Sequence, residues 1–292
     1  MSTLQVAHVR QFSDSVIMLA EQKESKLLPH VTMKRVNADY AYFDRMAGIE
    51  LIKKTTRHQE TPIGEIEHSR RRVFVETYHR AVLIDKDDTD RMVIDVQGPY
   101  VQRLGSACGR LYDRVIVSAL VGNAVSVDED LAGSNVALPS AQIVEEDVGA
   151  NNSNLNLDKL LRARRLMHEA NVDVSPIMVV SPKMLEALLG TTAVQSADYN
   201  SIKALVSGEV NSFCGFNFVR YNELPGTSIE ADPTLAIAFS KDALGFAMSR
   251  DKEVKISERQ DLSHSRQVYI ATSAGAVRLE EEKVVAIQCV GG

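Results

Sequence analysis

The chain has 292 residues, of which 45% are hydrophobic and 25% are charged, which is ordinary for a folded protein with one large domain or two smaller ones. Its 33 lysines and arginines against 39 aspartates and glutamates give a net charge of -6, which argues against a dedicated DNA-binding protein. The absence of tryptophan and an aromatic content of 5% argue against a protein that binds single strands by stacking.

The cysteines and the apolar segments indicate a soluble protein of a reducing compartment. The three cysteines are far apart and odd in number, which suggests neither a disulfide framework nor a zinc site. The first ten residues lack the basic start and apolar core of a secretory signal. The longest strongly apolar run, Val115 to Gly122, is too short to cross a bilayer, so no membrane association is expected.

The N-terminal segment, residues 4–28, has apolar residues at helical spacing and ends before Pro29. It is predicted to form an amphipathic helix, with Phe12 in its apolar stripe. Two arrangements remain open at this point. The helix either docks on the core of its own chain or lies as an arm on another subunit.

An extended region follows, which Tyr40 and Tyr42 are expected to anchor. Residues 49–57 and 70–84 are rich in β-branched and aromatic residues, and proline and glycine occur in the connection between them. These two segments predict a two-stranded hairpin about 30 Å long. Its basic residues are Lys53, Lys54, Arg57, Arg70, Arg71, Arg72 and Arg80. Because an isolated hairpin is marginally stable in water, this one needs a further surface to lie on.

Residues 99–122 predict one long helix of about 36 Å, because apolar side chains recur at spacings of three and four. The predicted stripe consists of Val101, Leu104, Cys108, Leu111, Val115 and Ala119. Gly105 and Gly109 lower helix stability by about 1 kcal/mol each relative to alanine. We therefore expect another backbone to pack closely against that face.

The rest of the chain predicts alternating helices and strands, and then mostly strands. A second amphipathic helix covers residues 156–172, with Asn154 or Asn156 as its N-cap. A buried strand at 176–181 leads into a short helix at 182–190, which begins with proline and ends with glycine. The remaining predicted strands are residues 215–221, 234–240, 244–249, 253–257, 266–279 and 283–290.

The sequence contains no recognisable catalytic, cofactor or metal motif. The glycines of residues 105–110 stand four apart inside a helix, unlike those of a phosphate-binding loop. The acidic cluster at residues 85–90 fails the calcium-loop pattern, because Asp90 and Val96 stand where glycine and glutamate are required. No histidines or cysteines stand at metal-ligand spacing, and no G-x-S-x-G motif occurs. The chain is therefore predicted not to be an enzyme and to bind no cofactor or metal.

Taken in order, the predicted elements resemble the major capsid protein of tailed bacteriophages, whose Hong Kong ninety-seven fold is shared with encapsulin shells. The resemblance covers nearly the whole chain. It is carried by "PIMVVSPKMLEALLG" (176–190), by "SFCGFNFVRYNELP" (212–225) and most sharply by the run of strands from residue 236 to residue 290. Each motif is loose on its own, and the specificity comes from their order.

The resemblance implies an α+β fold with four parts. These are an N-terminal arm at 1–46, an extended β-hairpin loop at 47–85, a peripheral domain with a long spine helix at 86–125 and 251–283, and an apical α/β domain at 126–250 and 284–292. Some members of the family carry a cleavable scaffolding domain, but here the arm begins almost at Met1, so a separate or dispensable scaffold is expected. Other members cross-link subunits through lysine and asparagine, and no partner can be matched for Lys53 or Lys54.

The resemblance also implies a structural protein that assembles as hexamers and pentamers into an icosahedral shell around double-stranded viral DNA. In the family the extended loop lies over a neighbouring subunit. The candidate contact residues are Phe12, Tyr40, Tyr42, Lys53, Lys54, Arg57, Arg70, Arg71 and Arg72. The arginine triplet would then meet acidic groups of the neighbour, around residues 85–90 or Glu280 to Glu282. Two alternatives remain for the arginine triplet: it lies on a solvated strand without a partner, or it contacts DNA directly.

The acidic net charge fits a container, because a strongly basic lining would hold packaged DNA along its whole length. Contacts with DNA are therefore expected to be weak and non-specific. Scaffolding, portal and decoration proteins could also take part, the expected location is the virion, and assembly is expected in the host cytoplasm. Two other functions remain open: an encapsulin-type compartment that holds cargo enzymes, and a soluble enzyme whose site is assembled from scattered residues.

Overall fold

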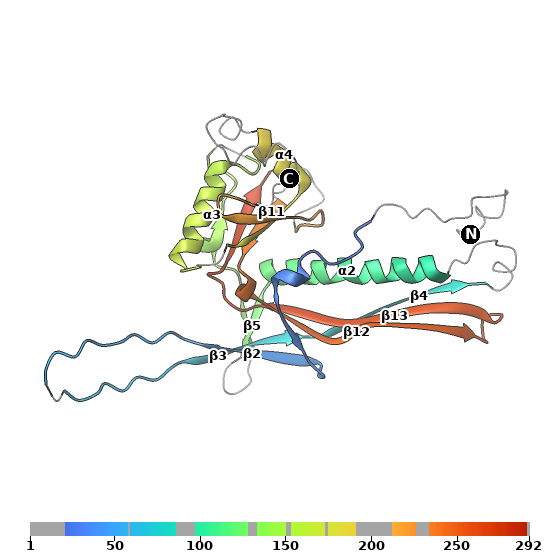
Figure 1. The fold of residues 1–292 in the computed structure, drawn as a ribbon, viewed down its shortest axis with the longest axis horizontal. Coiled ribbons are helices and arrows are strands. Elements are labelled where there is room, and N and C mark those ends of the chain that lie inside the picture. The colour runs from blue at the N-terminus through green and yellow to red at the C-terminus, as the bar shows by residue number, and fades with distance from the viewer. Residues whose placement is uncertain are drawn as a thin grey trace.

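The computed structural model describes residues 21–57, 59–85, 97–127, 133–149, 153–172, 175–190, 212–225 and 234–290. Most of the predicted N-terminal helix, with Phe12, and most of the acidic cluster at residues 85–90 lie outside these ranges. The molecule is elongated: a compact part stands at one end of helix α2 (Gln97–Val121), long strands run beneath this helix, and a loop projects beyond both (Figure 1). In the described part of the chain, no helix has the length and apolarity needed to cross a membrane.

The compact part is a six-stranded sheet with the order β7-β14-β11-β8-β10-β9. Its strands are β7 (Ile143–Val144), β8 (Ile177–Val180), β9 (Ser212–Phe213), β10 (Phe216–Arg220), β11 (Thr234–Phe239) and β14 (Val284–Cys289). Helices α3 (Leu157–Glu169) and α4 (Pro182–Gly190) contribute apolar side chains to the core on one face of this sheet. Of the two predicted N-caps of α3, Asn156 is confirmed, since its side chain accepts a hydrogen bond of 2.8 Å from the backbone N–H of Lys159.

A second sheet, which we call the long sheet, has the order β1-β12-β13-β4. Its strands are β1 (Thr32–Arg35), β4 (Glu76–Ile84), β12 (Leu244–Arg259) and β13 (Ser265–Arg278). The two segments predicted as strands at 244–249 and 253–257 are one continuous strand, β12, with register shifts between Met248 and Glu253. Residues 244–250, which the resemblance assigned to the apical domain, therefore lie in the same sheet as the strand residues that follow them.

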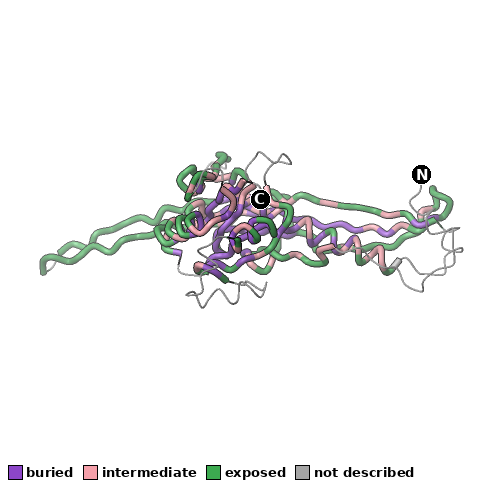
Figure 2. Tube along the Cα trace, turned by 90° about the horizontal axis from the view of Figure 1, so that it is seen from above, coloured by how far each residue is buried: buried purple, intermediate pink, exposed green. Residues whose placement is uncertain are grey.

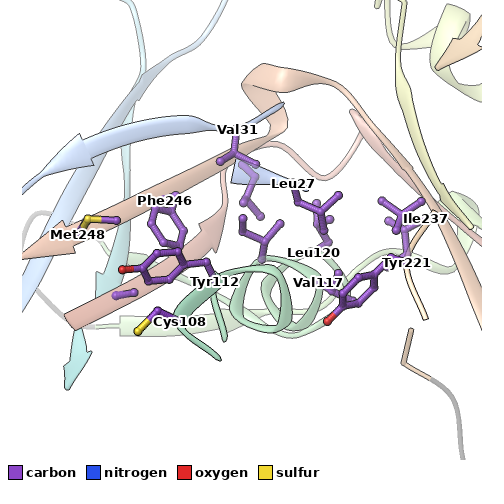
Figure 3. Close-up of a cluster of buried hydrophobic side chains, with 14 of the residues drawn as sticks. Leu27, Val31, Cys108, Tyr112, Val117, Leu120, Tyr221, Ile237, Phe246 and Met248 are labelled. Carbon is purple, nitrogen blue, oxygen red and sulfur yellow. The ribbon is translucent and has the colours of Figure 1, made fainter. Parts of the chain in front are cut away.

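Helix α2 lies along one face of the long sheet and carries the central core (Figure 3). Five of its buried residues recur every four positions: Leu104, Cys108, Tyr112, Ile116 and Leu120. Of the predicted stripe, Leu104 and Cys108 are buried, and Val101, Val115 and Ala119 are partly buried and pack against the same core. From Tyr112 onward, the most buried positions lie one residue beyond those predicted. Tyr112 packs edge-on against Phe246 of β12 with 5.7 Å between ring centroids, and its hydroxyl is 2.6 Å from Thr272 Oγ1 of β13.

A third sheet, which we call the base sheet, covers the opposite face of the long sheet at one end. Its order is β2-β3-β5-β6, with β2 (Tyr40–Met46), β3 (His68–Phe74), β5 (Ala124–Val127) and β6 (Gly133–Val136). The two sheets approach closely because glycine stands at the contact. A methyl group on Gly275 would overlap the carbonyl oxygen of Phe74, and one on Gly245 would lie 2.7 Å from the ring of Phe43.

The predicted hairpin between residues 49–57 and 70–84 is wrong in its pairing. Residues 49–57 form no strand, and β3 pairs instead with β2, while β4 pairs with β13 of the long sheet. The single segment 70–84 is divided at Val75, whose backbone N–H donates to Asp39 O at 2.9 Å between the two strands. This division lets one stretch of chain belong to two sheets.

Residues 21–35, which we call the strap, cross helix α2 and end as β1 at the edge of the long sheet (Figure 1). Residues 21–27 are not helical, contrary to the prediction. The buried carboxylate of Asp113 on α2 accepts their hydrogen bonds instead, which holds this part of the strap in an extended path. The donors are the backbone N–H groups of Lys26 (3.1 Å) and Leu27 (3.0 Å), the hydroxyl of Ser25 (2.5 Å) and the side chain of Gln22.

The predicted close packing on α2 is confirmed at one of its two glycines. A methyl group on Gly109 would lie 2.9 Å from the backbone of Glu24 and Ser25, so the strap passes directly over this position. A methyl group on Gly105 would meet nothing within 4 Å, and the prediction is wrong there.

Candidate functional site at the extended loop

The most exposed part of the described chain is the extended loop, residues 47–67, which joins β2 to β3 and projects away from the rest of the molecule (Figures 1 and 2). Every described residue of the loop is exposed, including Leu51 at 98% and Ile63 at 96%. Its base closes with a hydrogen bond of 2.9 Å from Ala47 N–H to Glu67 O, and at its tip Gln59 Oε1 accepts from the N–H of Thr55 at 2.8 Å. Among the described residues, none outside the loop bonds to residues 48–66.

The two arms of the extended loop carry opposite charge. The arm at 47–57 has Lys53, Lys54 and Arg57 against a single glutamate, and we call it the basic arm. The arm at 59–67 has three glutamates and neither lysine nor arginine, and we call it the acidic arm. Exposed apolar side chains lie on both: Ile49, Leu51, Ile52, Ile63 and Ile66. Burying such a side chain is worth about 1.5–3 kcal/mol, and its own subunit does not provide that burial.

The outer face of the base sheet brings together four of the residues singled out in the sequence. Side chains alternate along a strand, so β2 and β3 place six residues on this face: Tyr40, Tyr42, Asp44, Arg70, Arg72 and Phe74. Arg70 Nε lies 2.8 Å from Asp44 Oδ1, and the guanidinium of Arg72 stands 4.9 Å from the ring centroid of Phe74. The rings of Tyr40 and Tyr42 meet edge to face with 5.7 Å between centroids. The face is basic, aromatic and open.

The middle arginine of the triplet, Arg71, points to the opposite side of β3 and is buried. Its Nη2 is 2.7 Å from Glu281 Oε1 of the same chain. The expectation that Arg71 contacts a neighbouring subunit is therefore wrong, because strand alternation turns it toward the long sheet while its two neighbours face outward. Burial lowers the pKa of Arg71, and the negative charge of Glu281 opposes that shift.

Glu281 connects the base sheet to the end of helix α2. Its carboxylate lies 3.9 Å from Arg45 Nη1 of β2 and 3.8 Å from Nε of the fully buried Arg278. Arg278 in turn donates hydrogen bonds to the carbonyl oxygens of Leu120 (2.9 Å) and Gly122 (2.7 Å) at the C-terminal end of α2. This ionic network holds the strands from which the extended loop leaves the molecule.

The described part of the chain shows neither a cluster of metal-ligating side chains nor an activated cysteine. No three residues among its histidines, cysteines, aspartates and glutamates gather into a group that could hold a metal ion. Burial raises the pKa of all three cysteines, that of Cys289 to about 11, which keeps them as thiols rather than reactive thiolates. The geometry instead provides a projecting loop, which has arms of opposite charge and exposed apolar side chains, and a basic aromatic face. Both features suit association with another protein surface.

Sequence reasoning identified the basic arm and most of the outer face but overlooked their counterparts. The charge of the acidic arm comes from Glu60, Glu65 and Glu67, and a count of charges on either side of residue 58 would have revealed it. Lys34 and Arg35 lie beside the outer face because β1 adjoins it, and no local pattern in the sequence indicates this proximity.

Comparisons with known proteins agree with this description. The chain is similar to the capsid protein of the cyanophage P-SCSP1u (16% identity, TM-score 0.75, 99% of this chain and 94% of that chain covered). It is also similar to the capsid of Ralstonia phage GP4 (14%, 0.71, 97% and 95%) and to the head structure of Helicobacter pylori bacteriophage KHP40 (11%, 0.73, 97% and 96%). No curated protein matches its sequence significantly. A family model described as phage capsid protein matches residues 4–291, and the chain therefore belongs to the phage capsid protein family.

Proposed function

We propose that copies of this chain assemble into a closed icosahedral shell of hexamers and pentamers around double-stranded viral DNA, and that the extended loop binds each copy to the next. The observation that carries this proposal is the loop itself: its described residues, from Ala47 to Glu67, expose apolar side chains and form no bond with the rest of the described subunit. A partner surface supplied by a second copy would bury them.

The mechanism is association without a chemical step. A single exposed ion pair contributes roughly 0–1 kcal/mol, and each loop carries several charges and apolar side chains. A contact in which the loop of one subunit meets a different surface of the next is heterologous, and repeated by rotation it closes a ring. Many such weak contacts acting together give a stable shell from modest patches.

The viral shell is favoured over the two other functions. Membership of the phage capsid protein family favours a virion component over an encapsulin-type compartment with cargo enzymes. Because this family consists of structural proteins, we also propose that the chain is not an enzyme. Assembly would take place in the host cytoplasm, with scaffolding, portal and decoration proteins as further partners. Contacts with packaged DNA would be weak and non-specific, as the net charge of -6 favours.

The extended loop can be removed without disturbing the sheet that carries it. We would replace residues 48–66 by Asn-Gly, a two-residue turn that matches the pairing of Ala47 with Glu67. This variant, which we call the short-turn variant, should fold with the thermal stability of the wild type. It should form no shells, as judged by sedimentation and electron microscopy. A second variant, with residues 48–66 replaced by an equally long glycine–serine segment, should fail in the same way because it lacks the side chains. Normal shells from either variant would contradict the proposal.

A further inference from the structure

The proposed function leaves open which surface of the neighbour receives the extended loop. We propose that the acidic arm of one copy docks on the outer face of the base sheet of the next copy, at the hollow beside strands β1 and β2. This inference rests on the proposed function and adds to it the receiving residues and the sign of their charge.

The receiving hollow is basic. It has a volume of about 570 Å³, and the charged side chains that line it are Lys34, Arg35, Arg70 and Asp44. Its single carboxylate, Asp44, already accepts a hydrogen bond from Arg70, whereas Arg35 forms no ion pair within the described part of the chain. Three cations against one carboxylate leave an excess of two positive charges, which favours an anionic ligand.

The surroundings of the hollow are aromatic, and part of this surface is unsatisfied in the single subunit. Tyr40 is 49% exposed and Phe74 is 52% exposed, although both have large apolar rings. The Nε atom of Arg72 is shielded from solvent and has no hydrogen-bond partner. Such a surface is suited to bind a segment that presents apolar side chains together with carboxylates.

The acidic arm presents apolar and carboxylate side chains on the same face. In an extended chain residues two apart point to the same side, so Ile63, Glu65 and Glu67 share one face of the arm. One apolar side chain and two carboxylates thus meet the partner together. The basic arm has Lys53 and Lys54 against Glu50, and its excess of positive charge would be repelled by the same hollow.

The occupant must be a second copy, because the extended loop points away from its own base sheet (Figure 1). Each arm has about ten residues and, at about 3.3 Å per residue, reaches about 30 Å from the hollow of its own subunit. The loop of one copy lying on the loop base of the next is a head-to-tail contact, which repeats around a closed ring of subunits.

A charge exchange tests the inference. Arg35→Glu with Arg70→Glu reverses the net charge of the hollow, and Glu65→Arg with Glu67→Arg reverses the net charge of the acidic arm. Each pair alone should lower the fraction of protein that sediments as shells by at least about tenfold, because every such contact in the shell then places like charges opposite each other. All four substitutions together should restore this fraction to within about threefold of the wild type. A matched control, Arg250→Glu with Lys255→Glu, reverses two exposed cations on β12 and should assemble normally.

The outcomes separate this inference from the proposed function. If the short-turn variant forms no shells but reversal of the hollow leaves assembly intact, the loop binds elsewhere and only the receiving surface is wrong. Failure of the fourfold variant to recover, although its thermal stability equals that of the wild type, overturns the inference as well. If reversal of the hollow leaves shells intact but lowers their nucleic acid content, the hollow binds phosphates and the inference is again overturned.

Discussion

Two segments of this subunit run without a helix over most of their length and differ in how their polar groups are satisfied. The strap lies on helix α2, where the carboxylate of Asp113 accepts four of its hydrogen bonds, and it continues as a strand of the long sheet. The extended loop forms no bond with the rest of the described subunit, and its described residues are exposed (Figure 2). The strap is therefore part of the fold of the single subunit, whereas the apolar side chains of the loop find no cover in it.

The comparison shows that an extended conformation alone does not mark a contact between subunits. What distinguishes the two segments is burial. Leu27 and Val31 of the strap are buried in the central core (Figure 3), whereas Leu51 and Ile63 of the loop are almost fully exposed. A segment whose apolar side chains find no cover in its own chain is the one that a second copy can stabilise.

Among the polar interactions of the strap, the largest expected effect is the loss of its hydrogen-bond acceptor. Asp113→Ala leaves the buried N–H group of Leu27 and the half-buried N–H group of Lys26 without a partner, and it should lower the free energy of unfolding by about 3 kcal/mol. Urea unfolding of Asp113→Ala within the short-turn variant, which we expect not to assemble, measures this value, and hydrogen exchange at the two amides should accelerate. Asp261→Ala removes an exposed carboxylate paired with Arg259 and serves as the control, with a much smaller loss because solvent screens an exposed ion pair. Equal losses in the two variants would contradict the account of the strap.

A smaller effect is expected where the strap crosses α2. Gly109→Ala places a methyl group 2.9 Å from the backbone of Glu24 and Ser25, and it should destabilise the subunit by about 1–3 kcal/mol despite the better helix propensity of alanine. Gly105→Ala, one turn away in the same helix, meets open space and should stabilise the subunit by about 0.5–1 kcal/mol. Opposite signs in urea unfolding support the close approach of the strap, and two stabilising substitutions would refute it.

The electrostatic part of the strap should depend on pH. Burial raises the pKa of Glu21, but Arg103 at 2.8 Å and Arg110 at 2.9 Å outweigh burial and hold the pKa below its ordinary value of 4.5. A carboxyl group with a lowered folded-state pKa stabilises the fold fully above pH 4.5, and its contribution is lost as the pH falls through the lowered value. Glu21→Gln should therefore cost about 0.5–1 kcal/mol at pH 7 and progressively less in buffers below pH 4.5. A difference that does not change with pH would point to packing rather than charge.

Local periodicity was enough to predict most helices and strands of this protein. Helix α2, the cap of α3 at Asn156 and the strands from Thr234 onward follow from spacing and capping, which act between residues close in sequence. The order of these elements was specific enough to indicate the α+β capsid fold, which the family match and the solved structures confirm.

Pairing and partners could not be predicted, because they depend on residues far apart in the chain. The segment 70–84 looked like one strand, but a contact between Val75 and Asp39 divides it between two sheets. Arg71 looked like its neighbours, and only the position of Glu281, 210 residues away, shows that it forms an ion pair within the subunit. Asp113 gave one local signal, a carboxylate between the buried Tyr112 and Ile116, which indicates a buried acceptor but not its donors.

The substitution that we expect to affect the single subunit least is also the one that best distinguishes the extended loop from the strap. Leu51→Ser in the extended loop should change the free energy of unfolding by less than about 0.5 kcal/mol, because the side chain is 98% exposed. Leu27→Ala in the strap removes a fully buried side chain of the same kind and should cost about 2–5 kcal/mol. Shell formation should respond to Leu51→Ser all the same, since an exposed leucine that a neighbour covers contributes only in the assembled state. Sedimentation of Leu51→Ser should therefore show fewer shells at unchanged stability, and unchanged shell formation would mean that no neighbour covers this part of the loop.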